Sequence, residues 1–128
     1  MDKKKVVVKY KNGNQIKGYT NGFFPNKASF HIDTLNGEVK EIRLEDLKAV
    51  FFVWDFEGNK NHKKTYRNNV SGGGQKIKVT FRDGEEVVGY TSGYSPERQG
   101  FVMTTADLGG NNHRIYVVKS AARKIDFV

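Results

Sequence analysis

The sequence predicts an all-β protein built from two small, closed, five-stranded barrels in tandem. One stretch occurs twice at a constant spacing, because Gly13, Gly18 and Tyr19 recur 71 positions later (84 − 13) as Gly84, Gly89 and Tyr90. Short runs rich in Val, Ile and Phe are separated by Asn-Gly or Asp-Gly turn signals, and no long run has the helical period. Closing each short sheet would remove exposed strand edges. The expected units are residues 1–54 and 76–128, joined by a connector at 55–75.

The first unit is expected to contain five strands with a tight turn after the first. Asn12-Gly13 lies between two β-like runs, which is a strong hairpin signal. Gly18 inside the second run predicts a bulge or sharp bend, since glycine weakens a plain strand. Glu45-Asp46-Leu47 predicts one helical turn. The predicted strands are Lys5–Tyr10, Gln15–Thr20, Ala28–Thr34, Val39–Leu44 and Val50–Trp54.

The strand at Val50–Trp54 is apolar at every position, so both of its faces should be covered. One face would line its own barrel. The other would meet the second unit or a partner chain. We therefore expect the two units to share an interface, and a unit of about 55–60 residues is also close to the lower size limit for a self-sufficient core.

The second unit repeats the plan of the first. Arg114–Val118 is aligned with Glu41–Leu44, which places two additional residues of the second unit between its last two strands. Lys119–Arg123 is the expected helical turn. The predicted strands are Lys76–Phe81, Glu86–Thr91, Gly100–Thr105, Arg114–Val118 and Lys124–Val128.

The charge is uneven and positive, with 22 Lys and Arg against 14 Asp and Glu, a net +8. Such a balance suits an anionic partner, although it also simply keeps a small protein in solution. In a nucleic-acid binder, loop aromatics stack on bases while nearby cations contact phosphates. The connector carries the densest cations, and a plain solvated linker explains them equally well. The candidate contacts with an anionic partner are Lys60, Lys63, Lys64, Arg67, Lys27, Arg98, Phe23, Phe24 and Tyr94.

Catalysis and metal binding find little support in the sequence. The chain has no cysteine, and its histidines His31, His62 and His113 are scattered without ligand spacing. It also contains no nucleophile elbow and no phosphate-binding glycine loop. We expect no enzymatic activity, no cofactor and no metal. Neither a signal peptide nor an apolar membrane span is recognisable, which favours a cytoplasmic location.

The layout of each half resembles the Sm-like barrel: a strand, an Asn-Gly or Asp-Gly turn, a glycine-containing second strand, then three more strands. Members of that family that bind RNA carry an Asp and Asn in the third loop and an Arg-Gly pair between the last two strands. The corresponding loops here are Gly22–Lys27 and Glu45–Lys48, or Gly93–Arg98 and Lys119–Ala121. Neither RNA signature is present, so the resemblance implies a fold and assigns no site residue.

Over nearly its full length the chain also resembles an uncharacterised bacterial family of such tandem repeats. The shared segments are Lys17–His31, Leu47–Asn59, Gly93–Phe101 and Asn111–Val118. Related segments occur beside regulatory PilZ domains. The resemblance brings no established activity. Together with the lack of catalytic groups, it favours a non-enzymatic binding or adaptor module that acts through protein contacts in bacterial regulation. RNA or DNA binding is the alternative, and a homo-oligomer stays open.

Overall fold

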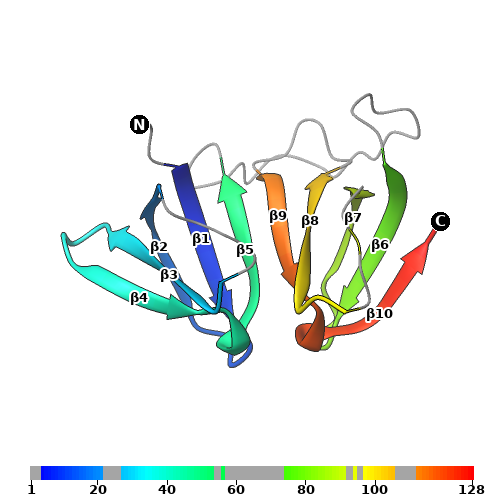
Figure 1. The fold of residues 1–128 in the computed structure, drawn as a ribbon, viewed down its shortest axis with the longest axis horizontal. Helices are drawn as coiled ribbons and strands as arrows, with labels where there is room; N and C mark the ends of the chain where they lie inside the picture. Colours follow the sequence, from blue (N-terminus) through cyan, green and yellow to red (C-terminus); the bar gives the residue numbers. More distant parts are fainter. Residues whose placement is uncertain are drawn as a thin grey trace.

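The computed structural model describes residues 4–21, 27–53, 56, 74–91, 94, 97–105 and 112–128. These residues form ten strands and two single turns of 3₁₀-helix, and none of them lies in an α-helix (Figure 1). The prediction of an all-β protein is confirmed. The repeat is also visible in the order of the elements, because each half has four strands, a 3₁₀ turn and a fifth strand.

The first unit follows the predicted order. Gly13 and Gly37 adopt positive φ angles of 94° and 89°, as the tight turns before β2 and β4 require of a glycine. The last strand begins earlier than predicted, at Leu47, directly after the 3₁₀ turn. The elements are β1 (Lys4–Tyr10), β2 (Gln15–Thr20), β3 (Ser29–Thr34), β4 (Val39–Arg43), η1 (Leu44–Asp46) and β5 (Leu47–Val53).

The second unit repeats these elements. Gly84 takes the place of Gly13, with a φ angle of 95°. The elements are β6 (Gln75–Phe81), β7 (Glu86–Thr91), β8 (Gly100–Thr105), β9 (Asn112–Val118), η2 (Lys119–Ala121) and β10 (Ala122–Phe127).

All ten strands belong to one antiparallel sheet with the order β10-β6-β7-β8-β9-β5-β1-β2-β3-β4. The predicted pair of closed barrels is therefore wrong, since the sheet is open and ends at β10 and β4 (Figure 1). The reason lies in the centre of the sheet. Closure of the first unit would require the second edge of β5 to pair with β4, and closure of the second unit would require that of β9 to pair with β10. Instead β5 and β9 use these edges to pair with each other. The two units thus join edge to edge.

The shared interface expected at the fifth strand is present. All seven residues of β5 are buried, and those from Ala49 to Val53 alternate between two hydrophobic cores. Ala49 and Phe51 pack with β9 residues Ile115 and Val117 in the core of the second unit. The opposite face packs into the core of the first unit through Val50, Phe52, Tyr116 and Val118. Trp54, the last residue of the predicted strand, lies outside the described residues.

Gly18 and Gly89 occupy equivalent positions, as the repeat predicts. Gly18 lies between Val6 of β1 and Thr34 of β3, and Gly89 lies between Ile77 and Thr105 in the same way. The register of β1 with β2 runs through Gly18 without a bulge. A Cβ atom on Gly18 would collide with the carbonyl oxygen of Asp33, and one on Gly89 with that of Thr104. The glycines therefore permit a close approach of the third strand.

The predicted alignment of the fourth strands is wrong. In the structure Phe30 pairs with Ile42 and Phe101 with Val117, so Ile42 corresponds to Val117 at an offset of 75 (117 − 42). The four additional residues of the second unit all lie between β8 and β9. The run from Ile115 to Val118 is apolar at each position, and such a run gives no alternation by which to fix a register.

Candidate functional site

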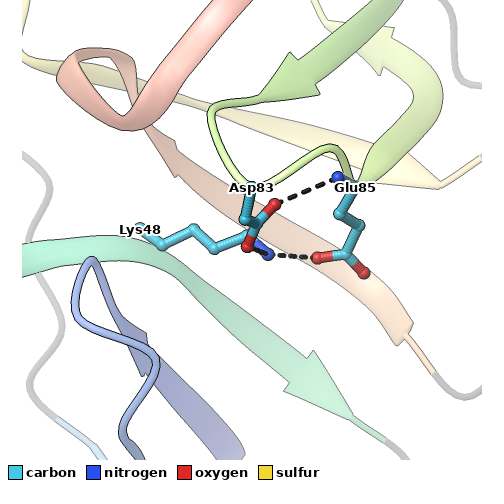
Figure 2. A network of polar contacts seen from close by, with 3 residues as sticks. All are labelled: Lys48, Asp83 and Glu85. Carbon is cyan, nitrogen blue, oxygen red and sulfur yellow. Dashed lines mark hydrogen bonds and ion pairs between the residues drawn. The ribbon is translucent and has the colours of Figure 1, made fainter.

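A charged cluster crosses the junction between the two units at Lys48 of β5 (Figure 2). The Nζ of Lys48 donates hydrogen bonds to Asp83 Oδ2 at 2.7 Å and to Glu85 Oε1 at 2.5 Å. Both carboxylates belong to the turn between β6 and β7, and the backbone N–H of Glu85 also donates to Asp83 at 3.0 Å. The ammonium lies 4.8 Å from the ring centre of Phe81, close enough for a cation–π interaction.

The electrostatics of this cluster are those of a structural ion pair. Burial acts to lower the pKa of Lys48, but the hydrogen bonds to Asp83 and Glu85 outweigh it and raise that pKa above its ordinary value. The hydrogen bond from Lys48 lowers the pKa of Asp83. Both groups are thereby held in their charged forms.

A small pocket of about 90 Å³ lies beside the cluster. Its polar walls are engaged in contacts within the protein, since Lys11 Nζ donates to the carbonyl oxygen of Glu45 and Arg82 Nε to that of Ser120. The volume is well below the ~300 Å³ at which drug-sized ligands are held. The pocket is lined by Lys11, Lys48, Phe81, Arg82, Asp83 and Ala121. Because the pocket is small and its polar groups are already bonded within the protein, we interpret it as part of the contact between the units.

Two of the predicted contacts with an anionic partner, Lys27 and Arg98, belong to loops that meet in the fold. The side chain of Gln99 donates to the carbonyl oxygen of Lys27 at 3.4 Å, so the loop before β3 meets the loop that carries Arg98. Lys27 and Arg98 are equivalent positions of the repeat (98 − 27 = 71). The junction between the units thus brings together the two loops that carry these cations, although the loops are far apart in the sequence.

Tyr94 has a place partly inside the protein. Its ring contacts Phe101 and Phe127 edge-on, with centroid distances of 5.2 and 5.3 Å, and it packs against the core of the second unit. Lys119 covers the ring at 5.2 Å. The remaining predicted contacts lie outside the described residues: Lys60, Lys63, Lys64, Arg67, Phe23 and Phe24.

The two edges of the sheet carry the large apolar side chains that the described part of the chain exposes. Val39 of β4 is 66% exposed, and Leu35 in the turn before it is 57% exposed. At the other edge Phe127 is 47% and Val128 67% exposed. Within the described residues, no strand pairs with the outer side of β4 or of β10.

A family model for a family of unknown function, DUF6982, matches residues 2–128. The chain belongs to this family. Because the match spans β1 to β10, the family model covers both halves of the sheet and the β5–β9 junction between them. No curated protein and no solved structure matches the chain.

In the ranges that the structure describes, no three His, Asp or Glu side chains gather as a metal ion would need. The described residues also contain no helix with the length and apolar character to cross a membrane.

Neither the Lys48 cluster nor the exposed apolar edges were predicted from the sequence. The sequence does contain one indication of the Lys48 cluster, because Lys48 is a single cation in a run of apolar residues that should be buried. A buried lysine needs an anionic partner, and the Asp83-Gly84-Glu85 turn supplies two carboxylates. The exposure of Val39 and Phe127 could not be predicted, because in the expected closed barrels both β4 and β10 would have been paired on their outer sides.

Proposed function

We propose that this protein is a non-enzymatic binding module that makes protein contacts through the two open edges of its sheet. The observation that carries the proposal is the gathering of exposed Val39, Phe127 and Val128 at those edges. An open strand edge presents backbone N–H and C=O groups that can pair with a strand of another chain. Apolar side chains beside those groups add burial to the hydrogen bonds.

The organisation of the chain suits such a role. All of β5 and residues Ile115–Val118 of β9 are buried, and these central strands form a stable frame between the edges. The edge strands β4 and β10 each have one strand neighbour in the described part of the chain. We further propose that each half is an Sm-like unit and that the protein serves as an adaptor in bacterial regulation. The Sm-like assignment is supported by the order of elements, because each half has five strands with a 3₁₀ turn before its fifth strand.

Glu41→Pro tests the proposal, with Glu41→Ala as its matched control. Glu41 is in the middle of β4, and its backbone N–H points away from β3, because the alternate residues Glu38 and Leu44 bond to the β3 side. Proline removes that N–H, whereas alanine keeps it. Tagged protein is used to isolate bound proteins from cells, and quantitative mass spectrometry compares the variants. Proteins that bind wild type and Glu41→Ala should be lost with Glu41→Pro. Equal recovery with all three would contradict binding through this edge.

Nucleic-acid binding is the second candidate, favoured by the meeting of the Lys27 and Arg98 loops at the junction. Its test is a fluorescence polarisation titration with random RNA and DNA. Phosphate contacts predict an affinity that falls roughly 10³-fold between 50 and 200 mM salt for about six contacts. The double variant Lys27→Gln/Arg98→Gln should weaken binding and flatten this salt dependence. Absence of binding at 50 mM salt would exclude this candidate.

A further inference from the structure

We propose that the edge at β10 pairs with the β4 edge of a second copy of this chain, so that the sheet continues from one molecule to the next. This inference rests on the proposed function, because it assigns the partner of the same open edges. The β5–β9 junction inside the chain supplies its geometry.

The repeat makes the outer edges the counterparts of that junction. In the first unit β1 pairs Val6 with Phe52, and in the second β6 pairs the equivalent Ile77 with Phe127. Strand β10 is therefore the counterpart of β5 at an offset of 75 (127 − 52). Strand β4 is the counterpart of β9 at the same offset, as the alignment of Ile42 with Val117 showed. Each strand of the internal junction thus has an equivalent at an open edge (Figure 1).

Backbone hydrogen bonds show which groups of β4 face outward. The N–H of Thr34 donates to the carbonyl oxygen of Glu38, and the N–H of Leu44 donates to that of Ala28. Since backbone groups alternate in direction along an antiparallel strand, every second residue from Glu38 to Leu44 faces β3. The N–H and C=O groups of Val39 and Glu41 consequently point away from the sheet.

The same argument applies to β10. The N–H of Val128 donates to the carbonyl oxygen of Lys76, so Val128 and Asp126 direct their backbone groups toward β6. Ile125 and Phe127 therefore direct theirs outward. Their counterparts in β5, Val50 and Phe52, pair with Tyr116 and Arg114 of β9.

Transferring the internal register to the outer edges gives a specific set of pairs. Phe52 pairs with Arg114 inside the chain, so Phe127 would pair with Val39 of the second copy. This contact covers two of the exposed apolar side chains at once. Phe51 pairs with Ile115, so Asp126 would face Lys40 of the second copy. Opposite charges across an antiparallel pair are stabilising.

The Lys48 cluster has a weaker counterpart in this arrangement. The counterpart of Lys48 on β10 is Arg123 (123 − 48 = 75). The counterparts of Asp83 and Glu85, at the offset of 71, are Asn12 and Asn14. Arg123 would meet amide oxygens of the second copy in place of carboxylates. Arg43, the counterpart of Val118, adds a second cation at that end. The outer pairing is thus expected to be reversible, in contrast to the apolar internal junction.

Because β10 and β4 are different surfaces, the contact is heterologous. Repetition of such a contact gives a closed ring if the rotation per molecule closes, and a filament if it does not. Sedimentation velocity over a wide range of protein concentration distinguishes a ring of fixed size from continued growth. A protein that stays monomeric at every concentration would overturn the inference.

A charge exchange tests the register. Lys40→Asp and Asp126→Lys each place like charges opposite one another and should raise the dissociation constant about 5–10-fold. The double variant restores opposite charges and should restore association. Lys4→Asp, at an exposed position of β1, changes the net charge as Lys40→Asp does and should leave association unchanged. Equal association by all four variants, or no recovery in the double variant, would contradict this register.

Glu41→Pro separates the inference from the proposed function. It should abolish self-association, whereas Glu41→Ala should retain it. If wild type is monomeric but loses other bound proteins on the Glu41→Pro substitution, a second copy is the wrong partner and the edge function stands. If Glu41→Pro retains both self-association and the bound proteins, both proposals are wrong. Circular dichroism and the melting temperature establish that the proline variant is folded.

Discussion

The β5–β9 junction and the outer edges have equivalent backbones but different side chains. At the junction every residue of β5 and the four residues Ile115–Val118 of β9 are buried. At the edges Ile42 is the one fully buried residue of β4, and β10 has none. Lys40, Glu41, Lys124 and Asp126 stand where the junction has apolar residues. Side chains, rather than backbone geometry, therefore decide which edge is permanently paired.

The largest effect is expected at the junction itself. Phe51→Ala removes a buried ring that packs with both units and should reduce the free energy of unfolding by about 3–5 kcal/mol. Urea denaturation monitored by circular dichroism measures this change. A loss below about 1 kcal/mol would show that the junction is not a well-packed core.

A smaller effect is expected at Gly100, which is the counterpart of Ser29 (100 − 29 = 71). A Cβ atom on Gly100 would collide with the carbonyl oxygen of Val117 and lie 2.6 Å from the ring of Tyr116. Gly100→Ala should therefore cost about 1–3 kcal/mol, as overpacked substitutions do. Ser29→Ala should change stability by at most about 0.5 kcal/mol, because it is a substitution away from the core. Thermal denaturation measures both changes, and equal destabilisation by Gly100→Ala and Ser29→Ala would contradict the expectation that only Gly100 is closely packed.

Lys48→Met tests the ion pairs across the junction. Asp83 and Glu85 have side chains 55% and 33% exposed, so they can rehydrate when the ammonium is removed. The expected cost is about 1 kcal/mol, well below that of breaking a fully buried pair. Urea denaturation at pH 7 measures it, and an unchanged midpoint would mean that the cluster contributes nothing to stability.

The difference between wild type and Lys48→Met should depend on pH with a defined sign. The folded protein lowers the pKa of Asp83, so its contribution is present above the ordinary value of 3.8 and is lost as pH falls through the lower folded value. It raises the pKa of Lys48, so that contribution is present below the ordinary value of 10.5 and is lost as pH rises through the higher folded value. Urea denaturation from pH 2 to 11 should show a plateau between these limits.

The smallest effect on monomer stability is expected at the open edge. Val39→Thr alters a side chain that is 66% exposed and should change the free energy of unfolding by at most about 0.5 kcal/mol. Measured in dilute protein, a larger loss would mean that this edge is already covered within one chain. The same variant should weaken self-association, since it replaces a methyl group that would pack against Phe127 with a polar hydroxyl.

The sequence was sufficient to predict the strands, the turns and the two-faced burial of β5. Repeated glycines and Asn-Gly or Asp-Gly turns are local signals, and the apolar run from Val50 needs cover whatever the topology. Closure was not predictable, because β5 could pair within its own unit or with β9 using the same backbone groups. The exposure of Val39 and Phe127 follows from that choice. The ion pair of Lys48 with a turn 35 residues away depends on it as well.

Amide hydrogen exchange, measured residue by residue at low and high protein concentration, tests the comparison most directly. We expect slow exchange for Val50 and Phe52 of β5 at both concentrations. Glu41 and Phe127 should exchange fast in dilute protein and slowly in concentrated protein, because pairing with a second copy protects their outward N–H groups. Exchange at Glu41 and Phe127 that is independent of concentration, together with fast exchange at Val50, would contradict both expectations.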